Sequence, residues 1–177
     1  MLYKHIIILT EFEVPKLNVI LTKELSNNGI SSQSIFYSDL QSNGNLKLSR
    51  QSLYVVFIPT VETFQHFSTT TKNLDMSYYS WLIIFREKNA NSECRSPTGN
   101  PFNLVFNTRM MVVCYDDNKI MKWFSLNGDD TDILELARWN PWGGIVYENI
   151  SYSDYRNDLG GITLRVITVK MNNFSEN

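Results

Sequence analysis

The sequence predicts a three-layer α/β fold whose sheet is mostly parallel. A short continuous apolar run is followed by apolar residues at helical spacing, and the same order of patterns is then repeated along the chain. After the second repeat come strand-like runs joined by a turn of polar residues. Alternating strands and helices form parallel βαβ units, and a hairpin then adds antiparallel strands to the same sheet.

The first unit begins with residues 2–9, a mostly apolar run that is typical of a buried strand. Pro15 suits the first turn of a helix, and Gly29, after Asn28, provides a left-handed stop. Between them, leucines recur every four residues: Leu17, Leu21 and Leu25. A second short strand is expected at 34–37, and a right-handed crossover makes it parallel to the first.

The second unit repeats this order. A buried strand is expected at 53–58, and Thr60, after a proline, is placed to cap a helix at 61–74. A fourth strand is expected at 81–85. The polar segment 87–101, which contains Pro97, Gly99 and Pro101, predicts a long surface loop.

The remainder of the domain is expected to be mainly β-structure. Three runs are strand-like: 102–106, 110–115 and 120–126. The last two are joined by residues 116–118, Asp-Asp-Asn, whose composition predicts a hairpin turn. The acidic cluster at 128–132 suits a helix N-terminus, and a short helix is expected at 133–139. The arrangement is that of a periplasmic-binding-protein-like lobe.

Composition places the chain among globular proteins. Of its 177 residues, 43% are apolar and 19% are charged, and the net charge is −2. This charge lacks the basic excess typical of nucleic-acid-binding proteins, so no nucleic acid is expected as a partner. The longest apolar runs are far shorter than the roughly 20 residues that a transmembrane helix needs. Residues 1–9 lack the apolar length and the cleavage site of a signal peptide.

Two features bear on the compartment. Cys94 is expected in a loop and Cys114 in a strand, and they either form a disulfide in an extracellular setting or remain as two free thiols. Asn149 and Asn173 are each followed two residues later by serine, which is the glycosylation acceptor pattern. These features permit an extracellular location and do not decide it.

No catalytic constellation is found in the sequence, and the chain is not expected to be an enzyme. His5 and His66 are interpreted as structural, because most histidines outside a recognised motif only satisfy local hydrogen bonds. No serine lies in a Gly-x-Ser-x-Gly elbow. Cys94 is followed by Arg95 but has no recognisable histidine partner, as a catalytic cysteine requires.

Cofactor and metal signatures are also missing. Residues 10–13, Thr-Glu-Phe-Glu, follow the first strand and are acidic where a dinucleotide-binding fold places glycines. Five aspartates form two acidic groups whose oxygens suit a hard cation: Asp116, Asp117, Asp129, Asp130 and Asp132. Their spacing matches no calcium-binding loop, and turn formation and helix capping explain them. Neither a cofactor nor a metal is therefore expected.

The carboxyl-terminal third carries the pattern that bears most on function. A short helix is expected to end at Trp139, a Gly-Gly pair follows at 143–144, and residues 158–166 are Asp-Leu-Gly-Gly-Ile-Thr-Leu-Arg-Val. This order resembles the junction ahead of the ligand-binding domain in insect chemosensory ionotropic receptors, a family similar to the ionotropic glutamate receptors. The residues that fit are Leu159, Gly160 or Gly161, Leu164, Arg165 and Val166. Family members often carry two arginines before this point, and here only Arg156 follows Tyr155.

The resemblance implies an extracellular amino-terminal α/β domain at 1–140, a linker at 141–161 and the first strand of a truncated ligand-binding domain at 162–177. The full receptor would be a ligand-gated cation channel of the plasma membrane that serves chemosensation and assembles with co-receptor subunits. Its small-molecule ligand would bind beyond Asn177, so no ligand-contacting residue is expected in this chain. Trp139 and Trp142 are interpreted as a plug between the domain and its linker.

Two alternatives come from other classes of protein. One is a self-contained soluble α/β binding or adaptor domain without catalysis, in which residues 161–169 are simply the last strand. The other is a hydrolase or transferase that uses an aspartate or a cysteine. It predicts a deep pocket at the carboxyl ends of the strands, near Thr10, Thr60 and Arg86.

Overall fold

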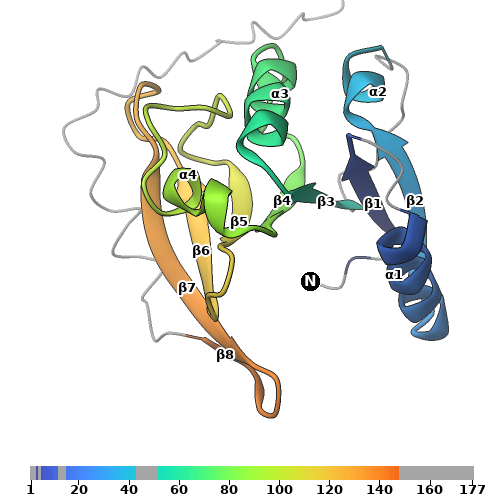
Figure 1. Cartoon of the computed structure of the whole chain (residues 1–177). Coiled ribbons are helices and arrows are strands. Elements are labelled where there is room, and N and C mark those ends of the chain that lie inside the picture. The colour runs from blue at the N-terminus through green and yellow to red at the C-terminus, as the bar shows by residue number, and fades with distance from the viewer. Residues whose placement is uncertain (1–2, 4, 12–14, 43–51, 148–177) are drawn as a thin grey trace, which may run out of the picture.

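The computed structural model describes residues 3, 5–11, 15–42 and 52–147 (Figure 1). Within these residues, eight strands form one mixed sheet in the order β2-β1-β3-β4-β5-β6-β7-β8. The first five strands are parallel to their neighbours, and the pairs from β5 to β8 are antiparallel. The predicted α/β class with a mostly parallel sheet is confirmed.

The first βαβ unit follows the sequence pattern closely. It consists of β1 (His5–Thr10), α1 (Pro15–Asn27) and β2 (Ser31–Phe36). Gly29 has a φ of +70°. The Ile30 N–H donates to the Leu25 carbonyl at 2.9 Å, and the Gly29 N–H donates to the Ser26 carbonyl at 3.0 Å. This pair of bonds is the glycine-terminated helix end that the sequence predicts.

The second unit begins with α2 (Tyr37–Ser42), a short helix that the sequence did not predict, and β3 (Ser52–Ile58). It continues with α3 (Val61–Thr71) and β4 (Ser80–Phe85). The Thr60 hydroxyl oxygen accepts a hydrogen bond from the Thr63 N–H at 3.3 Å, so Thr60 caps α3 as predicted. The helix ends at Thr71, three residues before the predicted end.

The core lies between α3 and one face of the sheet, and aromatic side chains fill its centre. Phe67 of α3 has its ring 6.1 Å from that of Trp81 and 5.2 Å from that of Phe102. Phe102 in turn stacks against Trp123, with ring centroids 5.8 Å apart. All four side chains are fully buried. Such rings bury large apolar areas and account for much of the stability of a small domain.

Part of the segment 87–101, which was predicted to be a long surface loop, is helical. It contains a 3-10 turn, η1 (Lys88–Ala90), and the short helix α4 (Asn91–Arg95). The predicted strand at 102–106 is wrong. Phe102 and Leu104 are buried, but the Asn100 side chain bonds both the N–H and the carbonyl of Leu104 and holds the backbone in a turn. The apolar pattern at 102–106 therefore arises because Phe102 and Leu104 are buried in the core, and not because the segment pairs in the sheet.

The predicted helix at 133–139 is also wrong. The hairpin of β5 (Arg109–Val113) and β6 (Lys119–Phe124) is followed by a nine-residue strand, β7 (Asp132–Asn140), which pairs with β6 from Asp132 to Arg138 with one register shift. Non-local pairing with β6 outweighs the local helical pattern. The acidic cluster before it does not cap a helix. The Asn127 and Asp132 side chains accept backbone N–H bonds within the turn between β6 and β7.

The sheet continues beyond the predicted domain boundary at residue 140. Residues 141–143 form a turn, and β8 (Gly144–Tyr147) pairs antiparallel with the end of β7. The first seven residues of the predicted 141–161 linker therefore belong to the hairpin of β7 and β8. The rest of that linker and the predicted strand at 162–177 lie outside the described residues.

The aromatic core should dominate the stability of the domain. Phe67→Ala is expected to lower the free energy of unfolding by about 3 to 5 kcal/mol, because it leaves a cavity among three other buried rings. Trp142→Ala is the matched control, since Trp142 is 96% exposed and its loss should change stability by less than about 0.5 kcal/mol. Urea unfolding followed by fluorescence measures both values, and equal losses would contradict this description of the core.

Candidate functional site

The sheet order places a topological switch point beside β1. The chain moves from β1 to β2 on one side and then crosses back to β3 on the other. In open α/β sheets, ligands bind at the carboxyl ends of the strands at such a point. The polar side chains there come from Glu11, just after β1, and from the first turns of α3.

Glu11 is the centre of this cluster. One carboxylate oxygen accepts a hydrogen bond from the Thr63 hydroxyl at 2.6 Å, and the other lies 2.9 Å from Nδ1 of His66. The Glu11 side chain is largely buried, whereas that of His66 is half exposed. Thr63 and His66 are both on α3, so one carboxylate joins the end of β1 to one face of that helix.

Tyr37, the first residue of α2, completes the cluster. Its ring packs edge-on against His66 with centroids 5.8 Å apart, and its hydroxyl donates to the Phe57 carbonyl at 2.8 Å. Burial, reinforced by the negative charge of Glu11, raises the pKa of the Tyr37 hydroxyl above its usual value. The phenol therefore stays neutral and serves as a hydrogen-bond donor.

This arrangement is better suited to holding the fold together than to catalysis. Both Glu11 oxygens are already engaged by α3, and the Tyr37 proton is committed to a backbone carbonyl. Within the described residues, no group of three or more potential ligands could hold a metal ion. The hydrolase alternative predicts a pocket near Thr10, Thr60 and Arg86. In the structure, Thr10 is buried and Thr60 caps α3. Arg86 is exposed.

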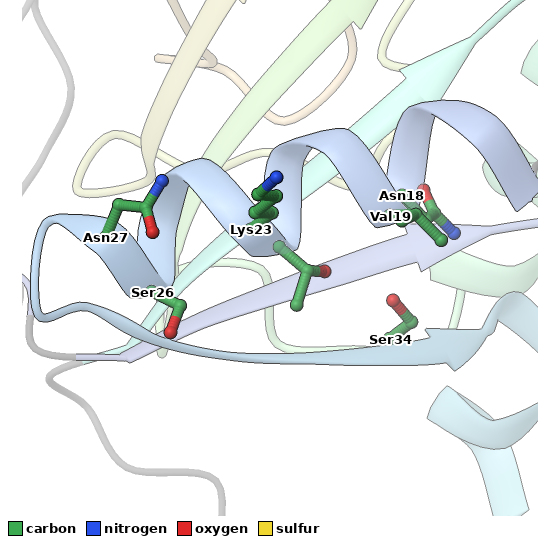
Figure 2. Close-up of a pocket in the computed structure, with 7 residues that line it drawn as sticks. Asn18, Val19, Lys23, Ser26, Asn27 and Ser34 are labelled. Atoms are coloured by element: carbon green, nitrogen blue, oxygen red, sulfur yellow. The ribbon is translucent and has the colours of Figure 1, made fainter.

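A groove is found elsewhere, between α1 and the edge strand β2 (Figure 2). Its volume is about 500 Å³. Asn18, Val19 and Ser26 lie along the side of α1 that faces β2, and Ser34 lies opposite them on the strand (Figure 2). The lining residues are Asn18, Val19, Thr22, Lys23, Ser26, Asn27 and Ser34. The groove is open to solvent and is lined by small or flexible side chains.

The two cysteines are joined in the structure. Cys94 in α4 and Cys114 at the end of β5 form a disulfide, with Cα atoms 5.6 Å apart. Of the two alternatives that the sequence left open, the structure contains the bond. The Arg95 guanidinium lies 3.5 Å from the Asp117 carboxylate in the turn that follows β5. The disulfide thus holds α4 against the sheet, and neither cysteine is available as a nucleophile.

The hairpin of β7 and β8 exposes a set of apolar side chains. The exposed members are Trp139, Trp142, Ile145, Val146 and Tyr147. Trp139 and Ile145 are cross-strand partners. Trp142 is almost completely exposed, so the interpretation of this tryptophan as a plug is wrong for the described part of the chain. The hairpin is an apolar surface at the edge of the sheet opposite β2 (Figure 1).

The remaining predicted positions have structural roles or lie elsewhere. The Nδ1 atom of His5 is 2.7 Å from the Ser31 hydroxyl, a contact that joins β1 to β2. Asp116 has a φ of +53° in the turn between β5 and β6, as the turn composition predicts. Asn149 and Asn173 lie outside the described residues. No helix in the described part of the chain is long and apolar enough to cross a membrane.

Sequence reasoning missed both the Glu11 cluster and the groove. Glu11 and His66 are 55 residues apart, and no spacing rule connects them. The position of Glu11 in the sequence could have indicated the cluster. Glu11 directly follows a buried strand, and polar groups at the carboxyl ends of parallel strands often form a site. The groove depends on β2 being an edge strand, and strand order is not contained in the local pattern.

No protein-family model matches the chain, and neither a curated protein nor a solved structure is significantly similar to it.

Removal of the disulfide should destabilise the domain. The bond closes a loop with a sequence separation of 20, for which chain entropy predicts a contribution of about 3 kcal/mol. The double variant Cys94→Ala/Cys114→Ala is expected to unfold in urea with a free energy lower by that amount. The unsubstituted protein in reducing buffer should behave similarly. An unchanged urea midpoint in both experiments would contradict the prediction.

The buried tyrosines should make the fold sensitive to alkali. Because burial raises the pKa of both Tyr37 and Tyr54, their neutral forms are favoured in the native state. The stability that these neutral phenols give the native state is fully present below pH 10, the usual phenol pKa. It is lost as the pH rises above that value. Tyr37→Phe should cost about 1 kcal/mol at neutral pH through the lost hydrogen bond and should reduce the alkaline loss.

The measurement for this prediction is urea unfolding at a series of pH values from 7 to above 10, where tyrosine titrates. Tyr115→Phe, at an exposed position, is the matched control and should leave the whole pH profile unchanged. An identical alkaline loss in the Tyr37→Phe protein and the unsubstituted protein would show that Tyr37 does not contribute to it.

Proposed function

We propose that the chain is the extracellular amino-terminal region of an ionotropic-receptor-like subunit, which forms a ligand-gated cation channel used in chemosensation. In this proposal the chain is a binding and assembly domain without catalytic activity. The small-molecule ligand binds downstream of the chain, and co-receptor subunits complete the channel.

The observation that carries the extracellular assignment is the disulfide between Cys94 and Cys114. Disulfides persist in oxidising environments such as the cell surface and are rare in the cytosol. Both cysteines are buried, and the bond fixes α4, the α-helix between β4 and β5. A structural disulfide of this kind supports a domain that faces the outside of the cell.

The architecture supports the same proposal. A sheet with the order β2-β1-β3-β4-β5 and helices between its parallel strands corresponds to the lobe type that the resemblance implies. Groups that an enzyme could have used have structural partners instead, which is compatible with a non-enzymatic role. In the described residues, the Glu11 carboxylate is engaged by α3 and the cysteines are bonded to each other.

The second candidate is a self-contained α/β binding or adaptor domain. It is favoured by one observation, which is that residues 132–140 are a strand of the main sheet. The resemblance takes this segment as a helix ahead of the ligand-binding domain. A chain whose sheet continues through that position is compatible with a domain that is complete without a second lobe.

Glycosylation tests the extracellular assignment. The native protein is expected to migrate faster on a gel after glycosidase treatment, because Asn149 lies in an acceptor sequence. Asn149→Gln should remove one step of this shift. Asn140→Gln is the matched control, since Asn140 precedes a proline and is not an acceptor.

Antibodies against the purified chain provide the second measurement. They should label intact, unpermeabilised cells that express the native protein. The source transcript, read beyond codon 177, should encode a further lobe and apolar segments of transmembrane length. A protein without glycan and without surface labelling, encoded by a transcript that stops after codon 177, would favour the self-contained domain.

A further inference from the structure

We propose that one face of the β7–β8 hairpin binds a second copy of this chain, so that two copies associate weakly about a two-fold axis. We refer to Trp139, Ile145 and Tyr147 as the hairpin face. The inference does not depend on the proposed channel function, because it rests on the register and the exposure of the described residues. Three observations carry it: the two unlike faces of the hairpin, the apolar area of one face and the lack of charge on that face.

The strand register defines the hairpin face. Strands β7 and β8 extend together away from the helices and are joined by the turn at 141–143 (Figure 1). Directly opposed residues of an antiparallel pair have their side chains on the same side of the sheet. Trp139 is opposite Ile145, and Tyr147, two residues after Ile145, lies on the same side. Trp142 lies in the turn, and the register assigns it to neither face.

The other face of the hairpin is charged. Val146 lies there opposite Arg138, which in turn is opposite Lys119 of β6. The Glu135 carboxylate lies 2.6 Å from Nε of Arg138 and 2.8 Å from Nζ of Lys119. Antiparallel strands with one apolar and one polar face are typical of sheets whose apolar face is covered. The hairpin therefore suits a partner that covers one side of it.

The hairpin face exposes enough apolar area for a small interface. Trp139 is 41% exposed, Ile145 is 53% exposed and Tyr147 is 77% exposed. Since an aromatic side chain has up to about 250 Å² of surface, the three residues expose about 350 Å². Apolar atoms make up about 65% of a homodimer interface, so this area corresponds to roughly 550 Å² per copy and about 1,100 Å² in total. That total is just above the lower limit for a specific contact, so weak association is expected.

The lack of charge makes the hairpin face compatible with its own copy. Residues 139–147 contain no charged residue, so two such faces meet without like-charge repulsion and without burying a charge. They also carry no charge by which a different partner would be selected. A two-fold axis brings the same surface of both copies together, and each side chain then contributes twice. Because β8 has only four residues, side-chain packing and not a shared ladder would hold the contact.

Sedimentation of the full chain at increasing concentration tests the association. The average mass is expected to rise from that of one copy toward that of two as the concentration approaches about 1 mM. In the same samples, the backbone amide resonances of β8 and the end of β7 should shift with concentration, and those of β2 should not. A chain that remains a single copy at the highest concentration, or shifts centred on β2, would overturn the proposal.

Two neighbouring residues of β8 provide a matched pair of variants. Ile145→Ser removes an apolar side chain from the hairpin face and should raise the Kd of the dimer about tenfold or more, since the loss occurs in both copies. Val146→Ser alters a side chain of similar size and exposure on the opposite face and should change the Kd by less than about twofold. Equal weakening by both substitutions would contradict a contact that uses one face.

A pair of charged variants keeps the test valid if Ile145→Ser loosens the hairpin. Tyr147→Lys and Tyr147→Glu each place like charges in both copies, so each protein alone should remain a single copy. An equimolar mixture of the two should associate at low salt, because the charges are then opposite. A damaged hairpin cannot regain association by mixing. A mixture that stays monomeric would show that the hairpin faces do not meet.

The same samples distinguish a second copy from other occupants of the hairpin face. A soluble paramagnetic probe should broaden the Trp139 side-chain resonances at low protein concentration and broaden them less at high concentration. Protection of Trp139 at every concentration would indicate another segment of the same chain. Flotation with phosphatidylcholine vesicles in place of self-association would indicate a lipid surface, and either result would rule out the proposed dimer contact.

Discussion

The packing of α3 against the sheet is the constraint on which the other features depend. Phe67 anchors this helix in the aromatic core, and the Thr63 and His66 side chains on the same helix hold Glu11 at the end of β1. The Ser68 hydroxyl donates to the Pro101 carbonyl at 2.6 Å and so fixes the segment that carries Phe102. Because Phe102 also contacts Trp123, α3 is linked through Phe102 to the antiparallel half of the sheet. One helix therefore couples regions that are far apart in the sequence.

The parallel half could be predicted from the sequence because its signals are local. A proline at the helix start, leucines at helical spacing and a glycine stop define α1, and Thr60 defines the start of α3. Of the antiparallel half, the hairpin of β5 and β6 could be predicted from its turn, whereas β7 and the segment around Phe102 could not, since their decisive interactions are not local. Residues 133–139 have a helical pattern, but most of them pair with β6, in a ladder with one register shift. Phe102 and Leu104 look like strand residues because they are buried, although the Asn100 side chain has taken the place of sheet pairing.

The candidate sites show the same difference between local and non-local signals more clearly. Glu11 follows a buried strand and His66 lies on a predicted helix, so each position was predictable while their contact was not. The groove beside β2 depends on the strand order, which is set by the handedness of two crossovers in opposite directions. The structure pairs the two cysteines only because α4 brings Cys94 next to the end of β5. Sequence reasoning finds the residue types, and the topology decides which of them meet.

The two edges of the sheet differ in length and in the side chains that they expose. β8 is only four residues long and exposes Ile145, Val146 and Tyr147, and the chain continues directly from it. A short edge strand offers few backbone groups, so its apolar side chains and not a ladder would determine any contact there. β2 has six residues, regular pairing with β1 along its length and no protective charge or proline. It also has a helix above it that forms one wall of a groove. The two edges therefore differ in kind, since β2 is the longer strand and mostly polar, whereas β8 is short and exposes apolar side chains.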